Sequence, residues 1–376
     1  MRLDRYSTQS IDEADIQAVV AVLRGGSLTG GEAVERFEAD LCAYTQAAHC
    51  VTFSSATAAL HAAYAVCGIG AQDEVIVPAI TFAATANAAL YCGARPVFAD
   101  IRFSDGLIDA RRIEALITPK TRAIVPVHYA GALCDMAALK PIAQKHNLTV
   151  IEDAAHALGS FDAAGKSAGT FGRMGIFSFH PVKPITTGEG GAIVTDDALL
   201  ADRLRLFRSH GIQKGRLWDQ EMVMLGHNYR LSDIACALGS SQLAKLDAHL
   251  AKRQAVADFY DRFFKNSDRI FPLRPANTAR HSRHLYPVLL DSGLWCAKES
   301  IFETLRAQGI GVQVHYKPVY RHRFYRELFG ELSLPQSEDF YRAALSLPCH
   351  GELTIDEAAQ AAQALLDAVN QAACKG

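Results

Sequence analysis

One lysine and one aspartate have side chains and surroundings suited to chemistry in this chain of 376 residues. Lys183 comes shortly after the apolar run 175–179, and Asp153 comes shortly after the β-branched pair 150–151. A lysine amine forms a Schiff base with an aldehyde and can then carry a proton. A carboxylate keeps a pyridine nitrogen protonated, so that the ring accepts electrons. Pyridoxal phosphate (PLP) chemistry needs both functions, and the pair indicates an aminotransferase. A lysine taken alone is more often a solvated surface residue, so the assignment of Lys183 depends on the neighbouring segments.

Segment 54–60 has the composition of an anion-binding helix start. Two serines follow the predicted strand 49–53, and Ala56 and Thr57 come next. Amide groups at a helix N-terminus point outward and bind phosphate, and a small residue at position 56 permits close approach. Simple N-capping by a hydroxyl side chain explains the same residues, and this alternative stays open.

Three further side chains stand where predicted strands end. Phe82, in segment 81–87, is suited to stacking on a flat heteroaromatic ring, although phenylalanine at such a place is more often part of the core. Asp153 itself could be only a helix N-cap. His156 either hydrogen-bonds a ligand or lines a turn. These alternatives also stay open.

Several other kinds of site are excluded by spacing. Segment 159–167 resembles a phosphate-binding P-loop but has five residues between its glycines, where the motif requires four. The fourteen histidines contain no H-x-x-x-H pair, and the nine cysteines contain no C-x-x-C pair. No G-x-S-x-G nucleophile elbow occurs. We therefore predict no metal site and expect reduced thiols.

Composition limits the partners. The formal net charge is −2, with 49% hydrophobic and 21% charged residues, as in an ordinary globular protein. No basic stripe suggests nucleic acid binding. No signal peptide is recognisable, and no run approaches the roughly 18 apolar residues of a membrane span. We expect a cytoplasmic protein that binds neither nucleic acid nor membrane.

The elements that must position these side chains form an α/β pattern. Short apolar strands alternating with helices indicate a mainly parallel sheet covered on both faces, with ligands beyond the carboxyl ends of its strands. A helical stretch at 232–264 is expected to link this large domain to a smaller α+β domain with strands at 284–290 and 311–315. The predicted division is an N-terminal arm at 1–11, a large domain at 12–245 and a small C-terminal domain at 246–376. The seven expected strands of the large sheet are 49–53, 74–77, 96–100, 123–127, 148–151, 175–179 and 192–195.

The order of these motifs resembles that of a known family. An anion-binding helix start, an aromatic residue, an acid at a strand end and a strand-end lysine are similar to the DegT/DnrJ/StrS-type sugar aminotransferases, which are PLP enzymes of fold type I. The resemblance runs from about residue 6 to residue 348. A subgroup that acts in pseudaminic acid biosynthesis is the most similar. The segments that carry the subgroup resemblance are 178–192, 226–230, 284–287, 314–318 and 346–350.

The resemblance implies roles for individual residues. Lys183 would bind the cofactor covalently, and Asp153 would pair with the pyridine nitrogen. Ala56 and His156 depart from the wider family, where glycine and glutamine are common, but both fit the subgroup. The implied cofactor contacts are Ala56, Thr57 and Ser178 to the phosphate, Phe82 on the ring, His156 near the ring hydroxyl, and Asn228 from the other subunit of a homodimer with shared active sites. The substrate-binding candidates are Arg230 for a diphosphate, with Tyr6, His315 and Tyr316.

The resemblance also implies a reaction. Glutamate would donate its amino group, by way of pyridoxamine 5'-phosphate (PMP), to C4 of a UDP-linked 4-keto-6-deoxy-N-acetylhexosamine. Another nucleotide-linked 4-keto sugar is the first alternative. A sugar 3-dehydratase of the same superfamily would carry histidine in place of Lys183. A non-catalytic regulator that binds a nucleotide sugar or PLP is the alternative from a different class.

Overall fold

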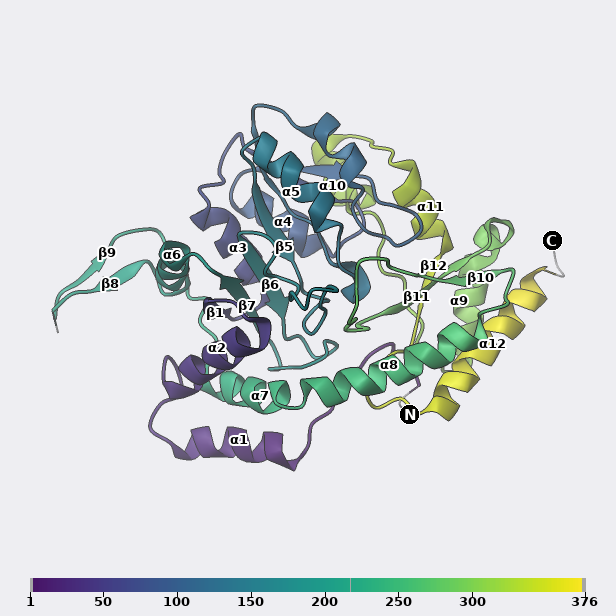
Figure 1. Ribbon diagram of the computed structural model, residues 1–376, viewed down its shortest axis with the longest axis horizontal. Coiled ribbons are helices and arrows are strands. Elements are labelled where there is room, and N and C mark those ends of the chain that lie inside the picture. The colour runs from purple at the N-terminus through teal and green to yellow at the C-terminus, as the bar shows by residue number, and fades with distance from the viewer. Residues whose placement is uncertain (1–2, 217, 374–376) are drawn as a thin grey trace.

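A seven-stranded sheet forms the centre of the protein, as seen in a computed structural model that describes residues 3–216 and 218–373 (Figure 1). The strand order is β1-β7-β6-β5-β4-β2-β3. Neighbouring strands from β3 to β6 run parallel, whereas β7 is antiparallel to both β1 and β6. The predicted α/β architecture with a mainly parallel sheet is confirmed. The strands are β1 His49–Phe53, β2 Glu74–Pro78, β3 Arg95–Ala99, β4 Thr121–Ile124, β5 Thr149–Asp153, β6 Met174–Ser178 and β7 Gly191–Thr195.

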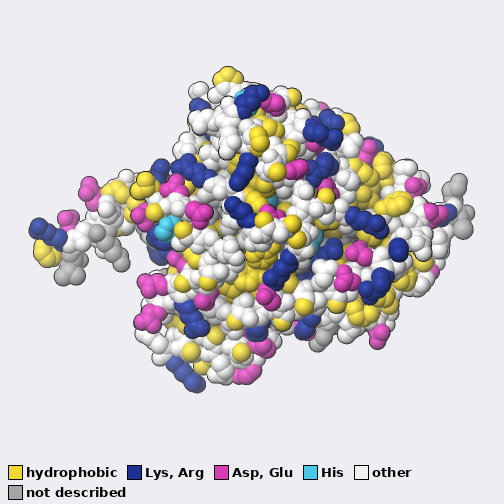
Figure 2. All heavy atoms as spheres, viewed as in Figure 1, with side chains coloured by type: hydrophobic (Ala, Val, Ile, Leu, Met, Phe, Trp, Pro, Cys, Tyr) yellow, Lys and Arg dark blue, Asp and Glu magenta, His cyan; other side chains and the backbone are white. Residues whose placement is uncertain are grey.

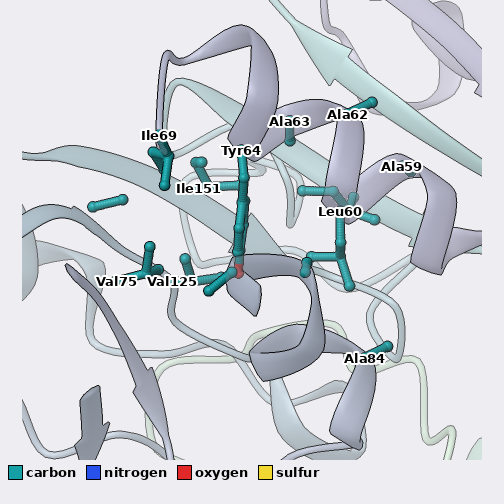
Figure 3. Packing of buried hydrophobic residues seen from close by; sticks show 14 of the residues in the cluster. Ala59, Leu60, Ala62, Ala63, Tyr64, Ile69, Val75, Ala84, Val125 and Ile151 are labelled. Carbon is teal, nitrogen blue, oxygen red and sulfur yellow. The ribbon is translucent and has the colours of Figure 1, made fainter. Parts of the chain in front are cut away.

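Helices cover both faces of this sheet, which explains why its strands are mainly apolar. Alternate side chains point to opposite faces of a strand, so Ile193 packs in one hydrophobic cluster and Val194 in another. In the first cluster, Tyr64 points from α3 into a group that includes Leu60, Val125 and Ile151 (Figure 3). One face carries α3 (Ala56–Val66), α4 (Ala83–Tyr91) and α6 (Ala198–Arg208), and the other carries α2 (Glu32–Thr45), α5 (Met136–Lys145) and α7 (Asp233–Leu243).

The predicted helix at 232–264 is two helices, α7 and α8 (Leu246–Phe263), which run nearly end to end in Figure 1. The helix is interrupted at Ala244 and Lys245. Lys245 turns its ammonium to Asp12 and Asp15, the N-cap and a first-turn residue of α1 (Glu13–Arg24). Because α7 packs against α1 and α2 while the second half of α8 enters a separate core, the two helices serve different parts of the molecule. The predicted division at 245/246 coincides with this break and stays a prediction.

A second, smaller sheet follows, with antiparallel strands in the order β10-β11-β12. The predicted strand at 311–315 is wrong, because only Gln313 forms a single bridge, to Ser346. The N–H of Gly311 instead donates to the carbonyl of Leu3, so this segment packs against the N-terminal arm. The elements of this region are β10 Ile270–Pro272, β11 Tyr286–Leu290, β12 Ala344–Leu347, α9 Lys298–Ala307, α10 Arg323–Phe329, α11 Pro335–Ala343 and α12 Ile355–Ala373.

A two-stranded hairpin, β8 (Ile212–Lys214) and β9 (Gln220–Met222), projects from the body at the left of Figure 1. On the face drawn in Figure 2, basic and acidic side chains are interspersed rather than gathered in one patch. None of the described helices has both the length and the apolar composition to cross a membrane. Cys374, one of the nine cysteines, lies outside the described residues. The short 3-10 helices are Ala110–Arg112, Glu114–Leu116, Tyr129–Gly131, Ser292–Ala297 and Val319–Arg321.

Gly191 lets β7 approach the first turn of α3. A Cβ atom added there would lie 2.5 Å from the Ala56 nitrogen and 2.7 Å from its Cα. We predict that Gly191→Ala lowers the free energy of unfolding by about 1–3 kcal/mol, because backbone atoms on both sides have to shift. Urea denaturation measures this loss. Gly26→Ala is the matched control, since a Cβ at Gly26 meets nothing within 4 Å, and equal losses in both variants would contradict the prediction.

Candidate functional site

A cavity of about 430 Å³ opens at the carboxyl ends of the parallel strands. Loops after β1, β2, β5 and β6 meet there, as the sheet topology requires. All of the sequence-predicted site residues line the cavity except Asn228 and Arg230. The predicted residues that it brings together are Tyr6, Ala56, Thr57, Phe82, Asp153, His156, Ser178, Lys183, His315 and Tyr316.

The start of α3 forms one end of the cavity. Ser55 is the N-cap, and its hydroxyl accepts the Ala58 amide at 3.1 Å. The amides of Ala56 and Thr57 occupy the first turn, where N–H groups have no acceptor within the helix. Ser178 lies opposite at the end of β6 and adds a hydroxyl. Capping and anion binding are therefore compatible here, because different groups do each.

Asp153 ends β5 and is 5% exposed. Its Oδ2 accepts the Thr85 hydroxyl at 2.7 Å, and its Oδ1 accepts the Ala155 amide at 3.1 Å. Residues 154–159 form turns, so no helix begins there for Asp153 to cap. The alternative of a helix cap is wrong, and a carboxylate with fixed orientation faces the cavity instead.

Thr85 was not foreseen as a site residue, although it lies within the predicted segment 81–87. An ionised carboxylate only accepts hydrogen bonds, so the Thr85 proton points to Asp153. The Thr81 hydroxyl, 2.7 Å away, then donates to Thr85. Tyr64 donates to the Thr85 carbonyl at 3.0 Å, which ties this turn to the core of α3. The orientation of the Asp153 carboxylate is thus fixed by Thr85, which is itself held by Tyr64 in the core.

Lys183 lies in the loop between β6 and β7, where its amide donates to the His180 carbonyl at 2.8 Å. Burial lowers the pKa of its ammonium from 10.5 to about 8. The Arg253 charge acts in the same direction, whereas Asp153 opposes it. The alternative of a solvated surface lysine is wrong, since the amine lines the cavity.

Three histidines surround this amine as neutral rings. Burial lowers the pKa of His156, His284 and His315, and the Lys183 charge lowers each of them further. The His156 Nδ1 accepts the Ala130 amide at 3.2 Å, so the ring proton of the neutral form is on Nε2 and points to the Tyr316 oxygen at 3.0 Å. The Tyr316 hydroxyl proton is therefore free for another acceptor.

Phe82 is 61% exposed and forms part of the cavity wall. The alternative that it belongs to the core is wrong. Its ring centroid lies 6.1 Å from that of Tyr316. An exposed phenyl ring at the cavity offers an apolar face on which a flat heteroaromatic group can stack.

Asn228 and Arg230 do not line this cavity. Asn228 is exposed and forms an isolated bridge with Ser209, and Arg230 is half-buried. Their predicted roles in a shared site concern a second copy of the chain and stay predictions. His284, in contrast, belongs to the segment 284–287 that carries the subgroup resemblance, but no role in the site was predicted for it from the sequence. Its Nε2 lies 3.4 Å from the Lys183 Nζ.

Comparison with known proteins agrees with this geometry. The sequence profile described as the DegT/DnrJ/EryC1/StrS aminotransferase family matches residues 9–366. A relative from Campylobacter jejuni, named UDP-4-amino-4,6-dideoxy-N-acetyl-beta-L-altrosamine transaminase, is 47% identical over 356 residues, or 94% of each chain. The resemblance stated from the motifs is confirmed.

Solved structures give the same result. Helicobacter pylori PseC, described as an aminotransferase involved in the biosynthesis of pseudoaminic acid, has a TM-score of 0.94 and 40% identity, over 97% of this chain and 99% of that chain. The putative sugar aminotransferase Spr1654 from Streptococcus pneumoniae, in its PLP form, has a TM-score of 0.93 and 31% identity, over 97% of this chain and 98% of that chain. Another structure of Spr1654 is of the PMP form.

The lowered pKa of Lys183 predicts a pH profile for its reaction with an aldehyde. Because only the free amine reacts, the rate at which added PLP modifies Lys183 should rise about tenfold per pH unit below pH 8 and level off above it. Borohydride trapping followed by peptide mass spectrometry measures this rate at Lys183 alone. A rate that keeps rising to pH 10 would show an ordinary lysine.

Proposed function

The chain belongs to the DegT/DnrJ/EryC1/StrS aminotransferase family, and from this premise we propose that it makes UDP-4-amino-4,6-dideoxy-N-acetyl-β-L-altrosamine. The amino group would pass from L-glutamate to C4 of the corresponding UDP-linked 4-keto sugar. The observation that carries the proposal is the 47% identity, over 94% of both chains, to a relative of that name. This reaction would serve pseudaminic acid biosynthesis.

The residues of the cavity fit PLP. The amides of Ala56 and Thr57 suit a dianionic phosphate, and Asp153 presents a carboxylate suited to a protonated pyridine nitrogen. Phe82 offers a face for the ring, and Lys183 an amine of lowered pKa. Bound there, PLP would supply an aldehyde and an electron-accepting ring, and would hold the amino group as PMP between the two halves of the reaction.

Lys183 is the group proposed to move protons. A general base works best when its pKa lies near the working pH, and a value of about 8 meets this condition. Asp153 keeps its charge within reach of the amine, while the neutral histidines add no further positive charge. The dehydratase alternative requires histidine at position 183, and the chain has lysine there.

A second copy of the chain would complete the site. Among the described residues that line the cavity no arginine occurs, yet a nucleotide diphosphate calls for strong cationic donors. Arg230 of another subunit would bind the diphosphate of the nucleotide sugar, and Asn228 of that subunit would bind the phosphate of the cofactor. Tyr6, His315 and Tyr316 then remain for the sugar.

The projecting hairpin supports a homodimer. Trp218, near its tip, is 82% exposed, and Met222 and Leu225 are also exposed. Large apolar side chains in such numbers on one projection are typical of a surface that meets another protein. Asn228 follows the same hairpin in the chain and is exposed as well.

An assay with labelled donor tests the function. Purified protein, PLP and ¹⁵N-labelled L-glutamate would be incubated with a panel of UDP-linked 4-keto sugars, and the products read by mass spectrometry and NMR. We predict a labelled 4-amino sugar of the β-L-altro configuration, and no multiple turnover by Lys183→Ala. Amination of a different sugar from the panel in its place would overturn the substrate, and turnover by Lys183→Ala would overturn the mechanism.

A mixing experiment tests the shared site. If Asn228 acts across the dimer, a heterodimer of Lys183→Ala and Asn228→Asp chains has one site with both changes and one with neither. We therefore predict that mixing the two inactive proteins restores activity toward half of the sites in each heterodimer. Mixing Lys183→Ala with Asp153→Asn is the matched control and should restore nothing, because both residues come from one chain's cavity. No recovery despite proven subunit exchange would place Asn228 in its own chain's site.

A further inference from the structure

His284 touches the reactive lysine from outside the cavity. It precedes β11 in the C-terminal region and is 2% exposed. Its Nε2 lies 3.4 Å from the Lys183 Nζ, although the two residues are 101 positions apart in the chain. Lys183 lines the cavity and His284 does not. A bound cofactor would therefore lie on one side of the amine, with His284 on the other.

The neutral His284 ring can hydrogen-bond to Lys183 whether the lysine is an ammonium or a free amine. Burial lowers its pKa, and so do the charges of Lys183 and Arg253, so the ring stays neutral. As a neutral imidazole, Nε2 accepts a hydrogen from an ammonium or an amine, and in the other tautomer it donates one to the amine. Its Nδ1 is buried without a hydrogen-bond partner in the described structure. Since Nδ1 is not committed to a fixed donor or acceptor, neither tautomer is imposed from that side.

The guanidinium of Arg253 bonds to the backbone on both sides of the contact between Lys183 and His284. Arg253 is 2% exposed, and its Nη1 donates to the His284 carbonyl at 3.3 Å and to the Cys349 carbonyl at 2.6 Å. Its Nη2 donates to the carbonyl of Val182, the residue before Lys183, at 3.5 Å. The partners of this guanidinium in the described structure are carbonyls and the Ser7 hydroxyl, rather than a carboxylate. Its charge is therefore not neutralised and still acts on the lysine.

The opposite face of His284 is also held. Its ring centroid lies 4.4 Å from that of His156, which is anchored in turn by the Ala130 amide and Tyr316. The two rings are tilted by 52° to each other, and a ring held by this contact and by its own backbone has little freedom to turn away. The position of Nε2 is thus set independently of the lysine.

We propose that His284 is a positioning residue that holds the Lys183 amine in place at the wall of the cavity whenever this amine is not bonded to the cofactor. A lysine side chain has four rotatable bonds, and an amine that wanders between proton transfers loses rate even when its pKa is suitable. The inference rests on the proposed role of Lys183 as the group that moves protons.

Two substitutions separate positioning from packing. In His284→Gln the amide group can take the place of Nε2, whereas in His284→Asn the shorter amide reaches only the place of Nδ1 and loses the lysine. We expect His284→Asn to slow the single-turnover reaction with L-glutamate by about tenfold to a hundredfold, with the glutamate concentration for half-maximal rate changed less than about twofold. His284→Gln should recover most of the loss.

The pH dependence of PLP trapping at Lys183 is a second measurement. It should not change if His284 only fills space in the core. Losing a hydrogen-bond acceptor disfavours the ammonium, so His284→Asn should shift the profile to lower pH, while His284→Gln should not. His281→Asn is the matched control, because the His281 Nδ1 accepts the Arg283 amide at 2.9 Å and an asparagine can preserve that bond. Equal effects of His281→Asn and His284→Asn, or a His284→Asn protein with unchanged rate and profile, would overturn the inference.

This experiment does not need the sugar substrate. Trapping with PLP and the half-reaction with glutamate remain measurable if the proposed sugar is wrong. A failed sugar assay and a failed His284 test are therefore distinguishable. Thermal unfolding of each variant checks that the fold is retained.

Discussion

A lysine amine of lowered pKa, in the wall of a cavity that also presents a fixed carboxylate, is the constraint on which the site depends. Burial and the Arg253 charge lower the pKa of the Lys183 ammonium, the Asp153 charge raises it, and the balance is a pKa of about 8. This balance requires walls from separate regions. The large sheet supplies the Lys183 loop and the end of β5, and the C-terminal region supplies His284, His315 and Tyr316. Packing between the two regions therefore contributes directly to the chemistry.

A buried group of polar residues holds the end of β5 and so keeps the Asp153 carboxylate in place. Glu152, one residue before Asp153, is fully buried and accepts hydrogen bonds from the His128 Nε2 at 2.8 Å and from the Gly169 amide at 2.8 Å. The His128 Nδ1 accepts the Cys134 amide, so its ring proton belongs on the side of Glu152. Side chains alternate along a strand, so Glu152 anchors β5 from one face while Asp153 points to the cavity from the other. A buried network of this kind is stabilising only when its groups are satisfied.

Several features could be predicted because they depend on local pattern. The strands of the large sheet are short and mainly apolar, and a parallel sheet directs their carboxyl ends to one edge. Lys183, Asp153 and Phe82 all follow such runs, and all line the same cavity. The prediction of a strand at 311–315 was wrong because local apolar composition does not show whether a neighbouring strand is available for pairing. Its Gly311 bonds to Leu3, far away in the chain. The break between α7 and α8 was missed for the same reason, since Asp12 and Asp15 hold Lys245 from a remote helix.

The sequence by itself determined which side chains can do the chemistry and at which strand ends they stand, because residue type and short-range periodicity are properties of neighbouring positions. Only the tertiary structure decided the surroundings that tune them. Thr85 reaches Asp153 across 68 positions, His284 reaches Lys183 across 101, and Arg253 reaches Cys349 across 96. Burial, hydrogen-bond direction and the field of a nearby charge depend on distances in space, and those distances exist only once the chain has folded.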